Sequence, residues 1–310
     1  MTAEQELSDS WDEEHRVPIL VHSSPMGTWP LPGSSTHIVF PPNPGKRLNL
    51  RVLFEPEDSR VLIVSLHGAL KRSKYSLPRF EWRGTLSRLV ADKLYLSDST
   101  LELSRALEIG WYLGTHQQDL TSQYAGVVAE FIKYGNYSKV LFVGSSAGGF
   151  GALALSRYFP GSIAVVFSPQ TAIANYHARH RDALLKSSLR KFSDFRLVEE
   201  SMPDRVSMRD AYGRGDHRNF VRYVQNAGDA FHFDEHYAPF ARQFDVDPAN
   251  GGFSADGRFE FLTEWQNDGH APPSRGRFVT HIAESYENFT GESLVQRSAD
   301  HGRESELGSR

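Results

Sequence analysis

The feature that most constrains the fold is the segment VLFVGSSAGG at residues 140–149. Its first four residues are apolar, which predicts a strand buried on both faces, as in a parallel sheet. Apolar residues at helical spacing follow and end before Pro160. Between strand and helix the pattern is Gly-x-Ser-x-Gly, with Ser146 at its centre and Gly144 and Gly148 on either side. A strand, a tight turn and a helix in this order are the setting in which that pattern carries a nucleophilic serine.

The chain around this segment alternates strand patterns with helical ones. Residues 48–54 alternate apolar and polar side chains, which predicts a half-buried strand, whereas 61–66 form a continuous apolar run. Further strands are expected at 93–96, 163–167 and 221–225, and further helices at 120–134 and 275–289. Buried strands separated by helices predict an α/β fold with a mostly parallel central sheet covered by helices on both faces.

Three regions depart from the alternation. Residues 1–47 form an N-terminal extension; the prolines concentrated in 17–47 predict extended chain and edge strands. The α/β domain spans 48–290, and residues 291–310 form a polar tail with no sustained apolar period. Within the domain, an insertion at about 170–217 separates two strands by about 50 residues, where a simple crossover needs about 20–25. Long insertions of this kind are usually functional, so a helical lid over the site is expected.

Two other readings of the glycine-rich turn fail. A phosphate-binding P-loop needs a lysine followed by serine or threonine, which is missing here. The run GFGALA at 149–154 imitates a dinucleotide-binding turn, but the next strand ends in Ser-Pro instead of an acidic residue that could bind a ribose. The interpretation of Ser146 as a nucleophile is therefore kept. The free amides at the start of the following helix would face the site of reaction.

With this segment the chain resembles the α/β-hydrolase superfamily, and its elbow GSSAGGFG resembles that of bacterial hydrolases linked to glycan acylation or deacylation. The resemblance covers about residues 48–290. It implies an oxyanion hole at the His-Gly segment after an early strand, here 67–70. The amides of Ala69 (or Gly68) and Ala147 are the candidates, and the side chain of His67 need not act.

The resemblance also implies an acid and a histidine that follow the serine in the chain. The acid should lie just past the strand after the lid, which points to Asp229, although Asp234 and Glu235 are close by. The histidine should lie in a late loop before the last helix, which points to His270 in DGHAPP. The order serine, aspartate, histidine is that of the superfamily. His67, Ser145 and Tyr176 are candidate substrate contacts.

Two histidine-rich patterns are expected to have structural roles. HFDEH at 232–236 imitates a zinc-protease motif, but it begins just past a strand end and is followed by Pro239, so no metal site is expected. The basic run HARHR at 177–181 predicts a solvent-exposed helix face. No cofactor is expected either.

Composition excludes several classes of protein. The chain has no cysteine, which rules out a disulfide scaffold, a thiol nucleophile and an iron–sulfur cluster. The formal charge of −4 over 310 residues argues against a nucleic-acid partner. Apolar runs are too short for a membrane span, and the acidic start does not resemble a secretory signal, so a cytoplasmic location is expected. Oligomeric state is not indicated.

The sequence thus predicts a serine esterase acting on a small-molecule or glycan ester through an acyl-enzyme. Ser146 would attack the carbonyl, His270 would take its proton, and Asp229 would orient the imidazole. An acyltransferase that passes the acyl group to a sugar or alcohol hydroxyl shares every one of these residues. A hydrolase-fold binding protein without activity is the third possibility.

Overall fold

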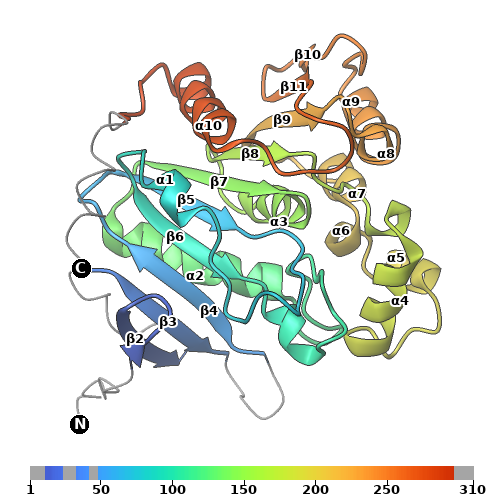
Figure 1. Cartoon of the computed structure of the whole chain (residues 1–310). Helices are drawn as coiled ribbons and strands as arrows, with labels where there is room; N and C mark the ends of the chain where they lie inside the picture. The colour runs from blue at the N-terminus through green and yellow to red at the C-terminus, as the bar shows by residue number, and fades with distance from the viewer. Residues whose placement is uncertain (1–10, 24–32, 42–47, 297–310) are drawn as a thin grey trace.

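The computed structural model describes residues 11–23, 33–41 and 48–296, which build one twisted sheet between two layers of helices (Figure 1). The sheet has 11 strands in the order β1-β2-β3-β4-β6-β5-β7-β8-β9-β11-β10. The six strands from β6 to β11 in this order run parallel to one another. The expected α/β architecture with a mostly parallel sheet is confirmed.

The strands are β1 (Trp11–Asp12), β2 (Val17–Ser23), β3 (Ser35–Phe40), β4 (Leu50–Glu55), β5 (Val61–Leu66), β6 (Asp92–Ser97), β7 (Lys139–Ser145), β8 (Ile163–Phe167), β9 (Phe220–Asn226), β10 (Gly252–Phe253) and β11 (Phe259–Glu264). The α-helices are α1 (Arg83–Leu86), α2 (Leu120–Gly135), α3 (Ala147–Ser156), α4 (Ala178–Ser187), α5 (Phe195–Ser201), α6 (Pro203–Val206), α7 (Met208–Gly213), α8 (Ala230–His232), α9 (Ala238–Gln243) and α10 (Arg275–Thr290). The described residues also form two short 3₁₀-helices, η1 (Ser99–Leu103) and η2 (Ile173–Asn175), and the π-helical η3 (Phe233–Tyr237).

Two apolar clusters hold the layers together, one on each face of the sheet. α2 and α3 pack on one face, where all ten residues of α3 are buried. α1 and α10 pack on the other, where Phe278 lies between Trp82 and Phe167. Because both faces are covered, the central strands can carry long apolar runs, such as VLIV in β5 and VLFV in β7.

One edge of the sheet carries two strands that the sequence pattern does not predict, β10 and β11, since FEFLTE is short and only its first part is apolar. At the other edge β2 and β3 form within the proline-rich region where extended chain and edge strands are expected, with β3 antiparallel to β4. In the tail, Leu294 is buried and Val90 N–H donates to the carbonyl of Val295. The rest of the tail, 297–310, lies outside the described residues.

The insertion between β8 and β9 contains η2 and α4 to α7 and lies beyond the carboxyl ends of the central strands (Figure 1). Arg205 fastens it to the loop before α2 by donating to the carbonyls of Leu113 and Thr115. No helix within the described ranges is both long and apolar enough to cross a membrane.

Candidate active site

Ser146 is the single residue that joins β7 to α3, and its backbone conformation is strained. Its φ of 55° and ψ of −123° lie in a region that non-glycine residues rarely occupy. The turn is held because the Ser146 amide donates to the carbonyl of Phe167 on β8, at 2.9 Å. The side chain is thereby lifted off the end of the sheet, at the amino end of a buried helix.

Both flanking glycines are required by contact. A Cβ on Gly144 would lie 2.4 Å from the carbonyl carbon of Gly148, and one on Gly148 would lie 2.3 Å from the carbonyl oxygen of Leu66. Both distances are shorter than real Cβ atoms allow. The Gly-x-Ser-x-Gly spacing therefore permits the close approach of β7, α3 and the end of β5.

The structure brings Ser146, His270 and Asp229 into one hydrogen-bonded chain. His270 Nε2 lies 3.0 Å from Ser146 Oγ, and His270 Nδ1 lies 2.6 Å from Asp229 Oδ2. Asp229 follows β9 and His270 lies in the loop before α10. Ser146 and Asp229 are buried, whereas the His270 side chain keeps 32% of its surface exposed.

Asn226, the last residue of β9, joins the loops that carry the acid and the histidine. Its side-chain amide donates to the carbonyls of Asn267 and Gly269, at 3.0 and 2.9 Å. In addition, Gly269 N–H donates to the Gly228 carbonyl at 2.9 Å. These bonds set the approach of Asp229 to His270. No sequence pattern marks them, because Asn226 is predicted only as the end of a strand.

A second histidine, His232, stacks flat on His270, with ring centroids 3.9 Å apart. His232 Nδ1 lies 2.9 Å from Asp229 Oδ2, so both imidazoles converge on one carboxylate oxygen. The His232 amide also donates to Asp229 Oδ1. Sequence reasoning had placed His232 in a chance metal pattern and missed this position; the three-residue spacing from Asp229 was the available signal.

Gln170 connects His232 to the serine, and a buried tryptophan fixes its orientation. The Trp111 indole N–H can only donate, and it does so to Gln170 Oε1 at 3.0 Å. The Gln170 amide nitrogen therefore faces Ser146 Oγ at 3.0 Å and His232 Nε2 at 2.8 Å. Since that amide nitrogen is a donor, His232 Nε2 accepts, and its ring proton sits on Nδ1 beside Asp229. No motif marks Gln170 or Trp111 in the sequence.

The electrostatics of this cluster favour an ionised Asp229 and a neutral His232. Burial raises the pKa of Asp229, but the contacts of its carboxylate with His232 and His270 outweigh burial and hold the pKa below its usual value. Burial lowers the pKa of His232, and burial lowers the pKa of His236 to about 3. The arrangement suits a carboxylate that stabilises a positive charge forming on His270.

The loop after β5, where the oxyanion amides are expected, approaches the serine at Gly68. A Cβ on Gly68 would be 3.8 Å from Ser146 Cβ. The Gly68 amide donates to Glu81 Oε2 at 3.3 Å. Of the three candidate amides, those of Ala69 and Ala147 have no acceptor among the described residues.

The three predicted substrate contacts are buried. Both ring nitrogens of His67 are taken by the backbone: Asp98 N–H donates to Nε2, and Nδ1 lies 2.8 Å from the Gly68 carbonyl. Ser145 ends β7 and is buried. Tyr176, in the insertion, is 8% exposed and packs against Trp111 and His232.

The alternatives to Asp229 are exposed. Asp234 and Glu235 lie on η3, and the Asn175 side-chain amide donates to Glu235. Asp229, His232 and His270 could offer ligand atoms within 4.8 Å of one another to a metal ion. Two of those residues already form the chain to Ser146, so an ion held there would break the contact between His270 and Asp229.

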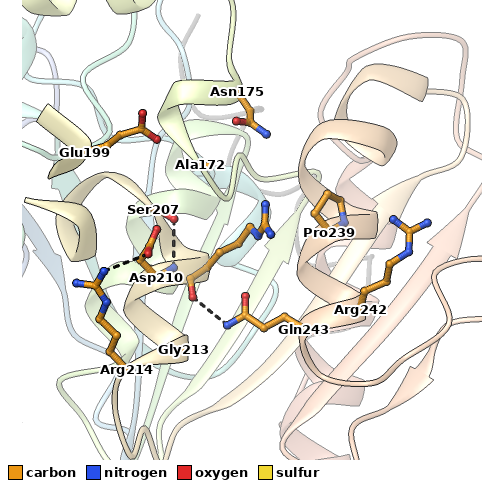
Figure 2. A pocket seen from close by; sticks show the side chains of 11 residues that line it. Ala172, Asn175, Glu199, Ser207, Asp210, Gly213, Arg214, Pro239, Arg242 and Gln243 are labelled. Carbon is orange, nitrogen blue, oxygen red and sulfur yellow. Dashed lines mark hydrogen bonds and ion pairs between the residues drawn. The ribbon is translucent and has the colours of Figure 1, made fainter. Parts of the chain in front are cut away.

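A cavity of about 810 Å³ opens between the insertion and α9 (Figure 2). Its wall includes Arg214 paired with Asp210, and Arg242 across from them. Ser146, Asp229 and His270 do not line it. A smaller cavity of about 420 Å³ is lined by residues 79–85, Pro272 and Arg275, and so borders the loop that carries His270.

Comparison with solved structures agrees with this architecture. The capsule O-acetyltransferase of Neisseria meningitidis serogroup A matches with a TM-score of 0.53 and 14% identity, over 79% of this chain and 95% of that one. Carboxyl esterase 2 of Tuber melanosporum matches with a TM-score of 0.51 and 14% identity, over 87% and 89%. The chain has the α/β-hydrolase fold.

A chain of the glycosylation-associated Gap123 complex from Streptococcus agalactiae also matches, with a TM-score of 0.58 and 15% identity. The match covers 85% of this chain but 48% of that one, so this chain spans about half its length. No protein-family model and no curated relative matches the sequence. The structural similarity, at identities of 14–15%, shows a shared fold.

Proposed function

We propose that the chain is a serine hydrolase that cleaves a carboxylic ester through an acyl-enzyme on Ser146. The observation that carries the proposal is the continuous chain from Ser146 Oγ through His270 to Asp229, with contacts of 3.0 and 2.6 Å. These are the distances at which a base can take the serine proton as the hydroxyl attacks. The fold similarity to an esterase and an O-acetyltransferase supports acyl chemistry.

Each residue then has a defined role. His270 Nε2 takes the hydroxyl proton and returns it to the leaving alcohol. Asp229 keeps the ring proton of His270 on Nδ1 and stabilises the imidazolium. The amides of Ala147 and Ala69 would hold the oxyanion. Gln170 donates to Ser146 Oγ, which leaves the hydroxyl proton directed at His270.

Transfer of the acyl group to a sugar or alcohol is the second candidate, and the O-acetyltransferase among the similar structures favours it. The exposure of His270 favours hydrolysis. With 32% of its side chain open, water can reach the base that must activate it in the second step.

The test is turnover of 4-nitrophenyl acetate by the wild type and Ser146→Ala, with the exposed Ser73→Ala as the matched control. We expect Ser146→Ala to lose activity by several orders of magnitude and Ser73→Ala to keep it. Adding glycerol separates the two reactions, because an acyltransferase would form acetylglycerol in place of acetate. Equal activity of wild type and Ser146→Ala would refute both.

A further inference from the structure

His232 is buried behind the serine and contacts three groups of the candidate site at once. Its ring Nδ1 lies 2.9 Å from Asp229 Oδ2, and its ring stacks on His270 with centroids 3.9 Å apart. Its Nε2 accepts from the Gln170 amide, 2.8 Å away, and the same amide faces Ser146 Oγ at 3.0 Å. The side chain keeps 2% of its surface exposed, which leaves almost no area for direct contact with a substrate.

His232 contacts both oxygens of the acid. Its backbone amide donates to Asp229 Oδ1 at 3.2 Å, while its ring nitrogen lies against Oδ2. That ring N–H lies beside Oδ2 without the alignment of a hydrogen bond, so the aligned approach to this oxygen is left to His270 Nδ1, at 2.6 Å. The carboxylate therefore cannot turn away from His270 without losing its contacts with His232.

His270 needs such support because of its place in the fold. Its side chain is 32% exposed, and it follows Gly269, which has a φ of 76°. The groups of a catalytic site have to be held within about 0.5 Å of the productive geometry by neighbours whose own side chains are fixed. The ring of His232 meets that need, because its plane lies 11° from that of His270 and it is itself packed. It is surrounded by the rings of Tyr176, Phe231 and His236.

The charge state of His232 also suits this role. Burial lowers the pKa of His232, and the Gln170 amide donates to its Nε2, so the ring stays neutral. A charged ring stacked at 3.9 Å would oppose the positive charge that forms on His270 when it takes the serine proton. A neutral ring gives the support without that repulsion.

We propose that His232 is a positioning residue for the reaction, which holds Asp229 and His270 in line with the serine and orients the Gln170 amide. The inference rests on the proposed function, because His232 acts through the residues that carry it out. It predicts a loss of turnover and not of substrate binding, since His232 is enclosed. Misplacing a catalytic group by about 1 Å can cost about 100-fold in rate, so kcat should fall by about 10–100-fold.

The kinetic test uses substitutions that each keep one part of what His232 does. His232→Asn can keep an N–H near the place of Nδ1, His232→Gln can keep an acceptor for Gln170, and His232→Phe keeps a flat ring against His270. We expect each to lower kcat for 4-nitrophenyl acetate by about tenfold or more while KM changes by less than about threefold, and His232→Ala to lose the most.

The matched control is His37→Asn, which also removes a buried histidine, but on β3, four strands away from β7 in the sheet. The free energy of unfolding is measured for every variant by denaturant titration. The proposal is overturned if kcat of the His232 variants falls no further than that of His37→Asn, or if KM rises while kcat is kept. Failure of all four His232 variants to fold would overturn it too, because the role would then be structural.

Proton NMR tests the geometry without turnover. The proton between His270 Nδ1 and Asp229 Oδ2 should give a downfield resonance that is absent from His270→Ala. We expect this resonance to persist in His37→Asn and to broaden or vanish in the folded His232 variants, because the released ring exchanges its proton with water. An unchanged resonance in those variants overturns the proposal.

The two experiments separate this inference from the proposed function. If the resonance depends on His232 but no ester is cleaved, His232 positions the pair and the hydrolase proposal fails. If cleavage requires Ser146 but is the same in the His232 variants as in the control, the hydrolase proposal stands and the positioning role fails.

Discussion

Replacing Gln170 with methionine tests the polar cluster behind the serine. Methionine is similar in length but offers no donor, so Trp111 Nε1–H and His232 Nε2 would lose their partner while remaining buried. A buried polar group left unsatisfied costs about 1–3 kcal/mol, so two such groups cost about 2–6 kcal/mol. That is a large part of the about 5–15 kcal/mol by which domains are stable.

The measurement is the free energy of unfolding from denaturant titration of Gln170→Met, with the exposed Gln117→Met as the control. Combining Gln170→Met with Trp111→Phe should cost less than the sum of the single changes, since the second removes the orphaned N–H. We also expect kcat to fall by about tenfold, because Ser146 Oγ loses a donor. A loss of stability below about 1 kcal/mol, or strict additivity, would refute the orientation assigned to Gln170.

Three further outcomes follow from the geometry. Asp229→Asn should lower kcat by about 10⁴ near neutral pH, as loss of the orienting acid does in serine proteases, whereas Asp234→Asn and Glu235→Gln should cost far less; turnover of the three variants decides which acid acts. Gly148→Ala should unfold the protein or misplace the elbow, because its Cβ would lie 2.3 Å from the Leu66 carbonyl oxygen, and circular dichroism with turnover measures this. Burial and the neighbouring His22 lower the pKa of His37 to about 3, so the unfolded chain binds a proton that the folded one does not below pH ~6.5. The contribution of His37 to the free energy of unfolding is therefore present above that pH and is lost as the pH falls below it, by about 2 kcal/mol at pH 5. His37→Gln should flatten the pH dependence of the free energy of unfolding.

The sequence allowed the sheet core to be predicted because β5, β7, β8 and β9 each contain a run of mostly apolar residues, a pattern typical of strands covered on both faces. The serine turn was predictable for a similar reason: glycines at 144 and 148 are required by direct contact, so the spacing records the geometry. Strand β11 could not be predicted in this way, because only its first residues are buried.

The polar cluster could not be predicted from the pattern. Gln170, Trp111 and His232 come from three separate segments, and they act through individual side-chain contacts that leave no periodicity in the sequence. Asn226 likewise holds the His270 loop by hydrogen bonds to backbone carbonyls, which carry no residue signature. Such positions become visible only once the fold has brought the loops together.

The central claim is that Ser146 is an activated nucleophile, and covalent labelling tests it most directly. The native protein is treated with a fluorophosphonate, its intact mass is measured, and the label is mapped by peptide sequencing. The account predicts one label per chain, on Ser146, and its loss in His270→Ala, because the hydroxyl reacts quickly only when a base takes its proton. Label on Ser145, or none on the folded wild type, would contradict the account.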